Sequence, residues 1–168
     1  GNFAFHKCQS LTSIAIGNGM TTIGIAAFSG CSSLASTATP NGVTTIGNFA
    51  FCECKCFAAI VIPRGIITID NSVFSKCQFL TTVVIPNDIT TIAYAAFYEC
   101  SSLASIVIPK SNKTIGGHAF DNCQSLAVIV LFVFHPPFDS HCPTRITRTA
   151  TSNTHPLCLA CNTSSSNT

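Results

Sequence analysis

Hydrophobic and small residues recur along the chain with a period of 23 residues. Cysteine and phenylalanine mark this period most clearly, each at one position per repeat. The cysteines are Cys8, Cys31, Cys54, Cys77, Cys100 and Cys123. The phenylalanines are Phe5, Phe28, Phe51, Phe74, Phe97 and Phe120. Self-similarity at a fixed period of this length predicts a solenoid, in which each coil buries its apolar face only by stacking on its neighbours.

One repeat, residues 80–102, predicts three local elements. The β-branched stretch up to Ile85 predicts a short strand that ends at Pro86, because proline cannot donate to a β-ladder. Residues 89–92 predict a second extended segment, and residues 95–100 predict a single helical or 3₁₀ turn. Stacking such coils at the strand spacing of about 4.8 Å places equivalent side chains on one another. One inward column predicted in this way is Leu11, Leu34, Phe57, Leu80, Leu103 and Leu126.

The repeat reads L-x-x-I-x-I-P-x-x-V-T-x-I-G-x-x-A-F-x-x-C, and this pattern resembles the BspA-like class of leucine-rich repeats. The resemblance implies an α/β fold, a right-handed solenoid with a parallel β-sheet on one face and short helical turns. It also implies a surface or secreted protein, since members of the class are linked to adhesion and to binding host proteins. We expect the solenoid at residues 1–131, and an irregular cap and Ser/Thr-rich tail at residues 132–168. The match of residues 1–5 to residues 47–51 predicts that the first coil is incomplete.

The low content of charged residues argues against some classes of partner. Charged residues make up 8% of the chain and the net charge is +2, against about 25% charged residues in ordinary proteins. There is no basic stripe that would follow a phosphate backbone, so we expect no nucleic-acid partner. The longest apolar run, residues 126–134, is about half as long as a membrane-spanning helix requires, so we expect a buried strand there and no membrane span.

Catalysis is not predicted. The five histidines have no spacing that pairs them with a nucleophile or a metal-ligand partner, and the six acidic residues are scattered. The chain has no G-x-S-x-G, no H-E-x-x-H and no glycine loop for phosphate. We therefore expect a non-enzymatic protein without a cofactor.

The cysteines divide into two sets. Those in the column point the same way on successive coils, so they are predicted to fill the core as thiols and not to form disulfides. The candidates for disulfides are Cys52, Cys56, Cys142, Cys158 and Cys161. Zinc is the alternative for the tail, because His141-Cys142 and the segment His155–Cys161 supply ligand types and a C-x-x-C spacing.

The outward side of the first strand in each repeat is the candidate interaction face. Its positions are small and uncharged, without aromatic anchors, and an apolar patch of this extent favours packing on another copy or another segment of the chain. A weakly exposed sheet without a partner is the alternative. The interaction face is predicted to comprise Ala15, Ala38, Ala58, Ala59, Val61, Val84, Val107 and Val130.

Other columns suggest further features. Residues Glu53, Lys76 and Glu99 alternate in charge, which favours the correct register. A threonine column could bind ice, although the adjacent column is interrupted at Ile67 and Lys113. Sequons at Asn112 and Asn162 predict attached glycans, and a sugar on Asn112 requires that position to be exposed.

Two functions follow from these observations. The first is a structural, self-assembling extracellular protein, whose partners are other copies of itself in a fibril or surface layer. The second is a cell-surface adhesion or ligand-binding module whose partner is another extracellular protein, and its support is the resemblance. Both predict an extracellular or cell-surface location.

Overall fold

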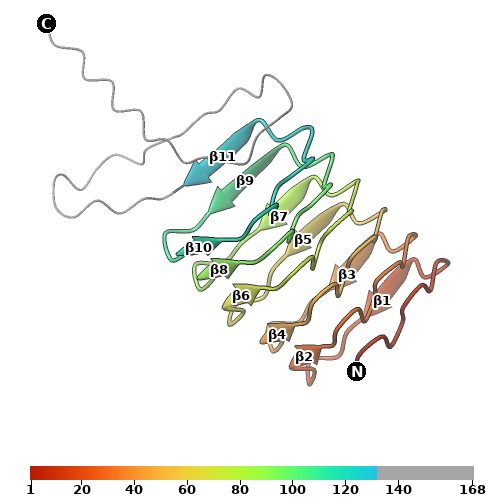
Figure 1. Ribbon diagram of the computed structural model, residues 1–168. Helices are drawn as coiled ribbons and strands as arrows, with labels where there is room; N and C mark the ends of the chain where they lie inside the picture. Colours follow the sequence, from red (N-terminus) through yellow and green to blue (C-terminus); the bar gives the residue numbers. More distant parts are fainter. Residues whose placement is uncertain (132–168) are drawn as a thin grey trace, which may run out of the picture.

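The chain winds into a solenoid whose coils each contribute one longer and one shorter strand (Figure 1). The structure is a computed structural model that describes residues 1–131, with the side chains of Thr37 and Ala38 excepted. The longer strands are β1 (Ser13–Ala15), β3 (Ser36–Ala38), β5 (Ala59–Val61), β7 (Thr82–Val84), β9 (Ser105–Ile108) and β11 (Val128–Leu131). The shorter strands are β2 (Thr22–Ile23), β4 (Thr45–Ile46), β6 (Thr68–Ile69), β8 (Thr91–Ile92) and β10 (Thr114–Ile115).

The strands of successive coils pair in parallel, in the register that the repeat predicts. Ile60 lies opposite Val83 in the β5–β7 pair, and Thr68 lies opposite Thr91 in the β6–β8 pair, so partners are one repeat apart. The longer strands form the ladders β1–β3, β5–β7 and β9–β11 side by side, and the shorter strands form β2–β4 and β6–β8–β10. The predicted parallel-strand solenoid is therefore confirmed.

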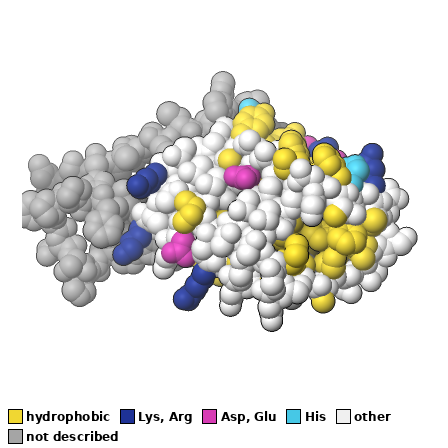
Figure 2. All heavy atoms as spheres, turned by 90° about the horizontal axis from the view of Figure 1, so that it is seen from below, with side chains coloured by type: hydrophobic (Ala, Val, Ile, Leu, Met, Phe, Trp, Pro, Cys, Tyr) yellow, Lys and Arg dark blue, Asp and Glu magenta, His cyan; other side chains and the backbone are white. Residues whose placement is uncertain are grey.

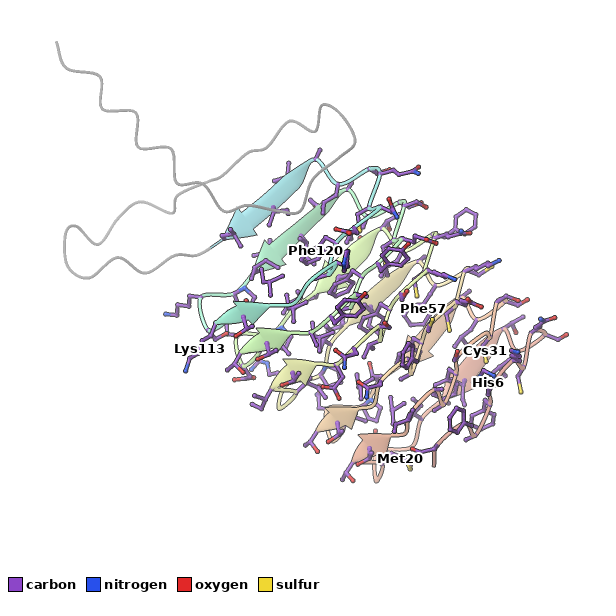
Figure 3. All side chains as sticks on the ribbon, viewed as in Figure 1. His6, Met20, Cys31, Phe57, Lys113 and Phe120 are labelled. Atoms are coloured by element: carbon purple, nitrogen blue, oxygen red, sulfur yellow. The ribbon has the colours of Figure 1, made fainter. Side chains whose placement is uncertain are left out.

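The columns form one continuous core between the two rows of strands and the turns that close each coil. Its centre is a stack of phenylalanine rings, in which Phe74 and Phe97 have centroids 5.5 Å apart and planes 13° apart. Phe97 and Phe120 continue the stack at 5.4 Å and 3°. Phe57 takes the place of leucine in its column and packs on Phe51, with ring centroids 5.6 Å apart. Figure 3 shows Phe57 and Phe120 inside the coils.

The predicted helical turns are wrong, because the described residues contain no helix. The backbone between each shorter strand and the next longer strand forms consecutive tight turns. Its N–H groups donate alternately to carbonyls within the turn and to carbonyls of the next coil. Tyr98 N–H donates to Ala95 at 3.1 Å, whereas Phe97 N–H donates to Ala119 of the next coil at 2.8 Å. Two residues in this segment of each complete coil adopt a left-handed φ, for example Ala95 at 53° and Glu99 at 57°, and this prevents a helix from propagating.

Candidate interaction face

The longer strands present alternate side chains to solvent, as a pleated strand does. In β5, β7 and β9 the central Ile60, Val83 and Ile106 are buried. Their neighbours Val61, Val84 and Val107 are 64%, 49% and 49% exposed, at equivalent positions of three successive coils. We call the row formed by Val61, Val84 and Val107 the valine ridge.

Small side chains surround the valine ridge. Ala58 and Ala59 are exposed beside Val61, and Ala15 is exposed in β1. Val130, at the equivalent position of β11, is half-buried, and the backbone of Ala38 pairs with that of Ala15. The structure therefore brings the predicted face together as one surface along the longer strands, without a charged residue in the strands that form it.

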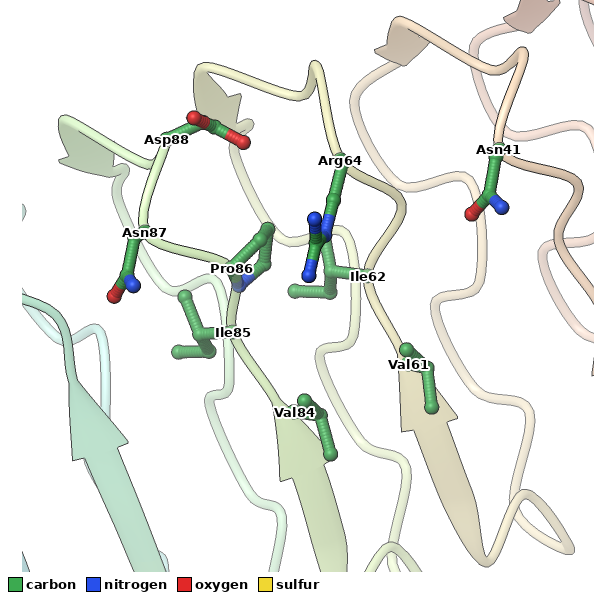
Figure 4. A pocket seen from close by; sticks show the side chains of 9 residues that line it. All are labelled: Asn41, Val61, Ile62, Arg64, Val84, Ile85, Pro86, Asn87 and Asp88. Carbon is green, nitrogen blue, oxygen red and sulfur yellow. The ribbon is translucent and has the colours of Figure 1, made fainter.

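An open hollow of about 430 Å³ lies at the carboxyl ends of β5 and β7 (Figure 4). Val61 and Val84 line it on the side of the strands. Arg64 and Asp88 line it from the turns that follow, and the remaining lining residues are Asn41, Ile62, Ile85, Pro86 and Asn87. The hollow thus joins the apolar ridge to a polar rim with one positive and one negative side chain.

The cysteine column does more than fill space. The thiol of Cys77 donates to the Phe51 carbonyl at 3.2 Å, and the thiol of Cys100 donates to the Phe74 carbonyl at 3.1 Å. The same bond recurs at Cys31, Cys54 and Cys123. Each bond crosses from one coil to the preceding one, so the thiols join neighbouring coils through weak hydrogen bonds.

Burial also makes these thiols unreactive. Desolvation raises the pKa of Cys54, Cys77 and Cys100, and it raises the pKa of Cys123 to about 12. A thiol that keeps its proton is neither a nucleophile nor a metal ligand at neutral pH. These four thiols are therefore structural in their chemistry, whereas Cys8, at the start of the column, is exposed.

The eight described cysteines are all free thiols. Cys52 is half-buried and Cys56 is exposed, and the disulfide predicted for them stays a prediction. The remaining candidates, Cys142, Cys158 and Cys161, lie outside the described residues, as do the alternative zinc ligands and the predicted cap. Within residues 1–131, no group of three or more potential metal ligands comes together.

Several sequence features lie on other faces. Lys76 donates to Glu53 at 3.2 Å, which raises the lysine pKa, and both side chains are largely exposed. Beside the threonine column that suggested ice binding, the hydroxyls of Thr44 and Thr90 donate to backbone carbonyls of the preceding coil.

The two sequons differ in what the structure describes. The side-chain nitrogen of Asn112, to which a glycan would be attached, is buried and has no hydrogen-bond partner among the described residues. Glycosylation there would require this atom to become exposed, and it stays a prediction. Asn162 lies outside the described residues.

Sequence analysis missed three asparagines at the corner that precedes the phenylalanine column, in three of the six repeats. The side-chain oxygen of Asn71 accepts the backbone N–H of Tyr94 at 3.1 Å, and Asn48 accepts that of Asn71 at 3.1 Å. Asn2 accepts the N–H of Ile25 in the same way. The signal was available, because these three asparagines share the 23-residue period.

Comparisons with known proteins agree with this geometry. A family model described as the BspA type leucine-rich repeat region matches residues 1–127 in six copies. A leucine-rich cell surface protein from Faecalibacterium prausnitzii is 33% identical, with a TM-score of 0.72, over 79% of this chain and 36% of its own. A leucine-rich repeat protein from Bacteroides ovatus is 35% identical, with a TM-score of 0.74, over 77% of this chain and 33% of its own. The chain thus spans about a third of each of these proteins.

A search of curated proteins finds no similar sequence. In the part of the chain that the structure describes, no helix has the length and apolar character needed to cross a membrane.

Proposed function

The chain belongs to the BspA-type leucine-rich repeat family, and we propose that it is a non-catalytic scaffold at the cell surface or outside the cell that associates with further copies of itself. The observation that carries this proposal is the valine ridge, three exposed valines at equivalent positions of the neighbouring, uncharged strands β5, β7 and β9. Repeat solenoids offer extended surfaces of this kind for association.

Another copy fits the valine ridge better than an unrelated partner does. Protein-binding faces that recognise a distinct partner are typically anchored by tyrosine, tryptophan or arginine, and the strands here carry none of these at their outward positions. The face is regular from coil to coil, so it can meet the same face of a second copy in a self-complementary contact. These valines are already about half-buried, so burying the remaining surface of each one stabilises such a contact by about 1 kcal/mol.

Imaging by negative-stain electron microscopy at several concentrations tests the proposal. We expect paired or regularly stacked particles that increase with concentration. The variant Val84→Asp places a charge in the middle of the ridge and should leave single particles. Ile67→Asp is the matched control, because Ile67 is an exposed branched residue (52%) next to the shorter strand β6. Single particles of the unaltered chain at every concentration would refute self-association.

Adhesion to another extracellular protein is the second candidate. It is favoured by the similarity to the cell surface protein of F. prausnitzii and by the hollow, whose rim carries Arg64 and Asp88. If the chain is a single particle in solution and binds a foreign protein in a manner that Val84→Asp abolishes, this candidate replaces the first.

A further inference from the structure

A second exposed surface lies on a different side of the coils, at the corner that follows each shorter strand. Counting coils from residue 1 in steps of 23, the corner is formed by the second and third residues of each coil. Large exposed side chains occupy it in turn: Phe3, Ile25, Phe49 and Tyr94 in the first, second, third and fifth coils. We call these four residues the corner ridge. Phe49 and Tyr94 are 46% and 55% exposed, although Phe28, Phe51 and Phe97 nearby are buried.

The aromatic rings of the corner ridge stand on every second coil. Two coil rises amount to about 10 Å at the strand spacing. The fourth coil has only Asn71 and Ser72 at this corner, so a polar gap separates the ring of Phe49 from that of Tyr94. Figure 2 shows small, separate groups of hydrophobic side chains along the upper edge of the described residues and one broader hydrophobic area toward the lower right.

The backbone beneath these rings is fixed. The N–H of Phe49 donates to the Asn71 carbonyl at 3.0 Å, and the Tyr94 carbonyl accepts the N–H of Ser72 at 3.0 Å. The Tyr94 N–H donates to the side chain of Asn71, and its ring meets His118 edge to face at 5.4 Å. A surface held in this way loses little conformational entropy when it binds.

One feature of the corner has a conformational cost. Phe49 has a φ of 60°, a left-handed conformation that is unusual for a bulky residue, whereas Ala26 and Ala95 occupy the same position in other coils. A small residue would satisfy the turn, so the aromatic side chain is not required by the backbone. Backbone strain of this kind indicates that the Phe49 side chain serves a function other than stabilising the fold.

Charge around the corner ridge disfavours anionic partners, although Glu53 is paired with Lys76 and Asp121 contacts His118. The first seven residues of the six coils contain two lysines, Lys7 and Lys76, and four carboxylates, Glu53, Asp70, Glu99 and Asp121. Phosphate, sulfated sugars and anionic lipid headgroups would all meet excess negative charge here. A neutral ligand with flat apolar faces and hydroxyl groups meets no such penalty.

We infer that the corner ridge binds a neutral, extended, β-1,4-linked glycan chain. A sugar ring in such a chain advances by a distance close to one coil rise, and successive rings are turned over, so the same face recurs on every second sugar. Aromatic rings on every second coil match that recurrence, because the C–H face of a sugar packs on an aromatic ring. Asn48 lies beside Phe49 and Asn71 lies in the coil between the rings of Phe49 and Tyr94. The side-chain oxygens of both asparagines already accept backbone N–H groups, so their side-chain N–H groups are what they offer to sugar hydroxyls. This surface is separate from the valine ridge, so the inference does not depend on self-association.

Isothermal titration with β-1,4-linked hexasaccharides of glucose, N-acetylglucosamine, xylose and mannose tests the inference. A hexasaccharide spans the three aromatic positions and a disaccharide spans one, so we expect at least one hexasaccharide to bind at least tenfold more tightly than its disaccharide. A heparin hexasaccharide should not bind. Absence of binding by all four neutral hexasaccharides would overturn the inference.

Variants assign the binding to the corner ridge. Phe49→Ala combined with Tyr94→Asn uses residues that other coils already carry at these positions, and circular dichroism and urea unfolding should confirm that the fold is kept. This double variant should weaken hexasaccharide binding at least tenfold, whereas Phe79→Ala should not, although Phe79 is 62% exposed. The inference would be overturned if the double variant and Phe79→Ala lost hexasaccharide binding equally, or if the double variant lost none. It would also be overturned if the double variant lost binding to phosphatidylcholine vesicles and kept binding to the hexasaccharide.

Discussion

The buried cysteine column should make this fold sensitive to alkali. Cys54, Cys77 and Cys100 are fully buried, and desolvation raises the pKa of each thiol. In the unfolded chain the same thiols have a pKa of about 8.5. Unfolding above that pH therefore releases protons that the folded state retains.

The sign and the size of the effect follow from this difference. Because the folded state binds more protons, the free energy of unfolding falls as pH rises. It is unaffected below about pH 8 and falls by about 1.4 kcal/mol per pH unit for each thiol above the unfolded pKa. At pH 10 each buried thiol lowers the free energy of unfolding by about 2 kcal/mol. Three thiols together then remove about 6 kcal/mol, which is comparable with the whole stability of many domains.

Urea denaturation followed by circular dichroism, in the presence of a reductant, measures this loss at pH 7.5 and pH 10. The variant Cys77→Ala isolates one thiol, since the Phe51 carbonyl still accepts the N–H of Cys54 at 3.2 Å and is not left without a donor. We expect this variant to be less stable at pH 7.5 by about 1–2 kcal/mol through lost packing. At pH 10 it should regain about 2 kcal/mol relative to the unaltered chain. An equal difference at both pH values would refute the reasoning.

Three further predictions concern single elements of the coil. A maleimide at pH 7.5 should label the exposed Cys56 within minutes and the buried Cys77 only when the chain unfolds. Peptide mass spectrometry measures both rates, and rapid labelling of Cys77 would contradict its burial. Phe97→Ala should destabilise the fold by about 3–5 kcal/mol in urea denaturation, because it leaves a gap in the ring stack. The exposed Phe79→Ala should change stability by less than about 0.5 kcal/mol, and equal effects of these two substitutions would speak against the stack. Asn71→Ala should cost about 1 kcal/mol in the same assay, because the Tyr94 N–H loses its acceptor; a neutral result would mean that water replaces the amide.

The stacking of the coils could be predicted from the sequence because it depends only on the period. Residues one repeat apart must lie over one another in a solenoid, so the inward columns and the outward valines were fixed once the period of 23 was known. The same logic gave the parallel register, for example Ile106 opposite Ile129.

The turns could not be predicted in the same way. Left-handed φ values usually reveal themselves through glycine or asparagine, but here Ala95, Glu99 and Lys76 adopt them. The stacked coils fix these residues by hydrogen bonds between coils, a tertiary effect that local propensity does not contain. An alanine-rich segment therefore looked helical when it was not.

The hydrogen bonds of the thiols could not be predicted either, because the period does not give the direction of a side chain. The period shows that Cys77 lies under Cys100, but not that each thiol is directed at a carbonyl of the preceding coil. The corner ridge was hidden because its residues alternate between two neighbouring positions, Phe49 at one and Tyr94 at the other, so that neither column is aromatic throughout.

Self-association through the valine ridge is the central claim, and sedimentation equilibrium of the unaltered chain and of Val84→Asp tests it most directly. Burying an unpaired carboxylate at the centre of an apolar contact costs several kcal/mol. We therefore predict that the unaltered chain associates reversibly and that the variant dissociates at least about 100-fold more readily. The same dissociation constant for both proteins, or a monomer at every concentration of the unaltered chain, would contradict the account.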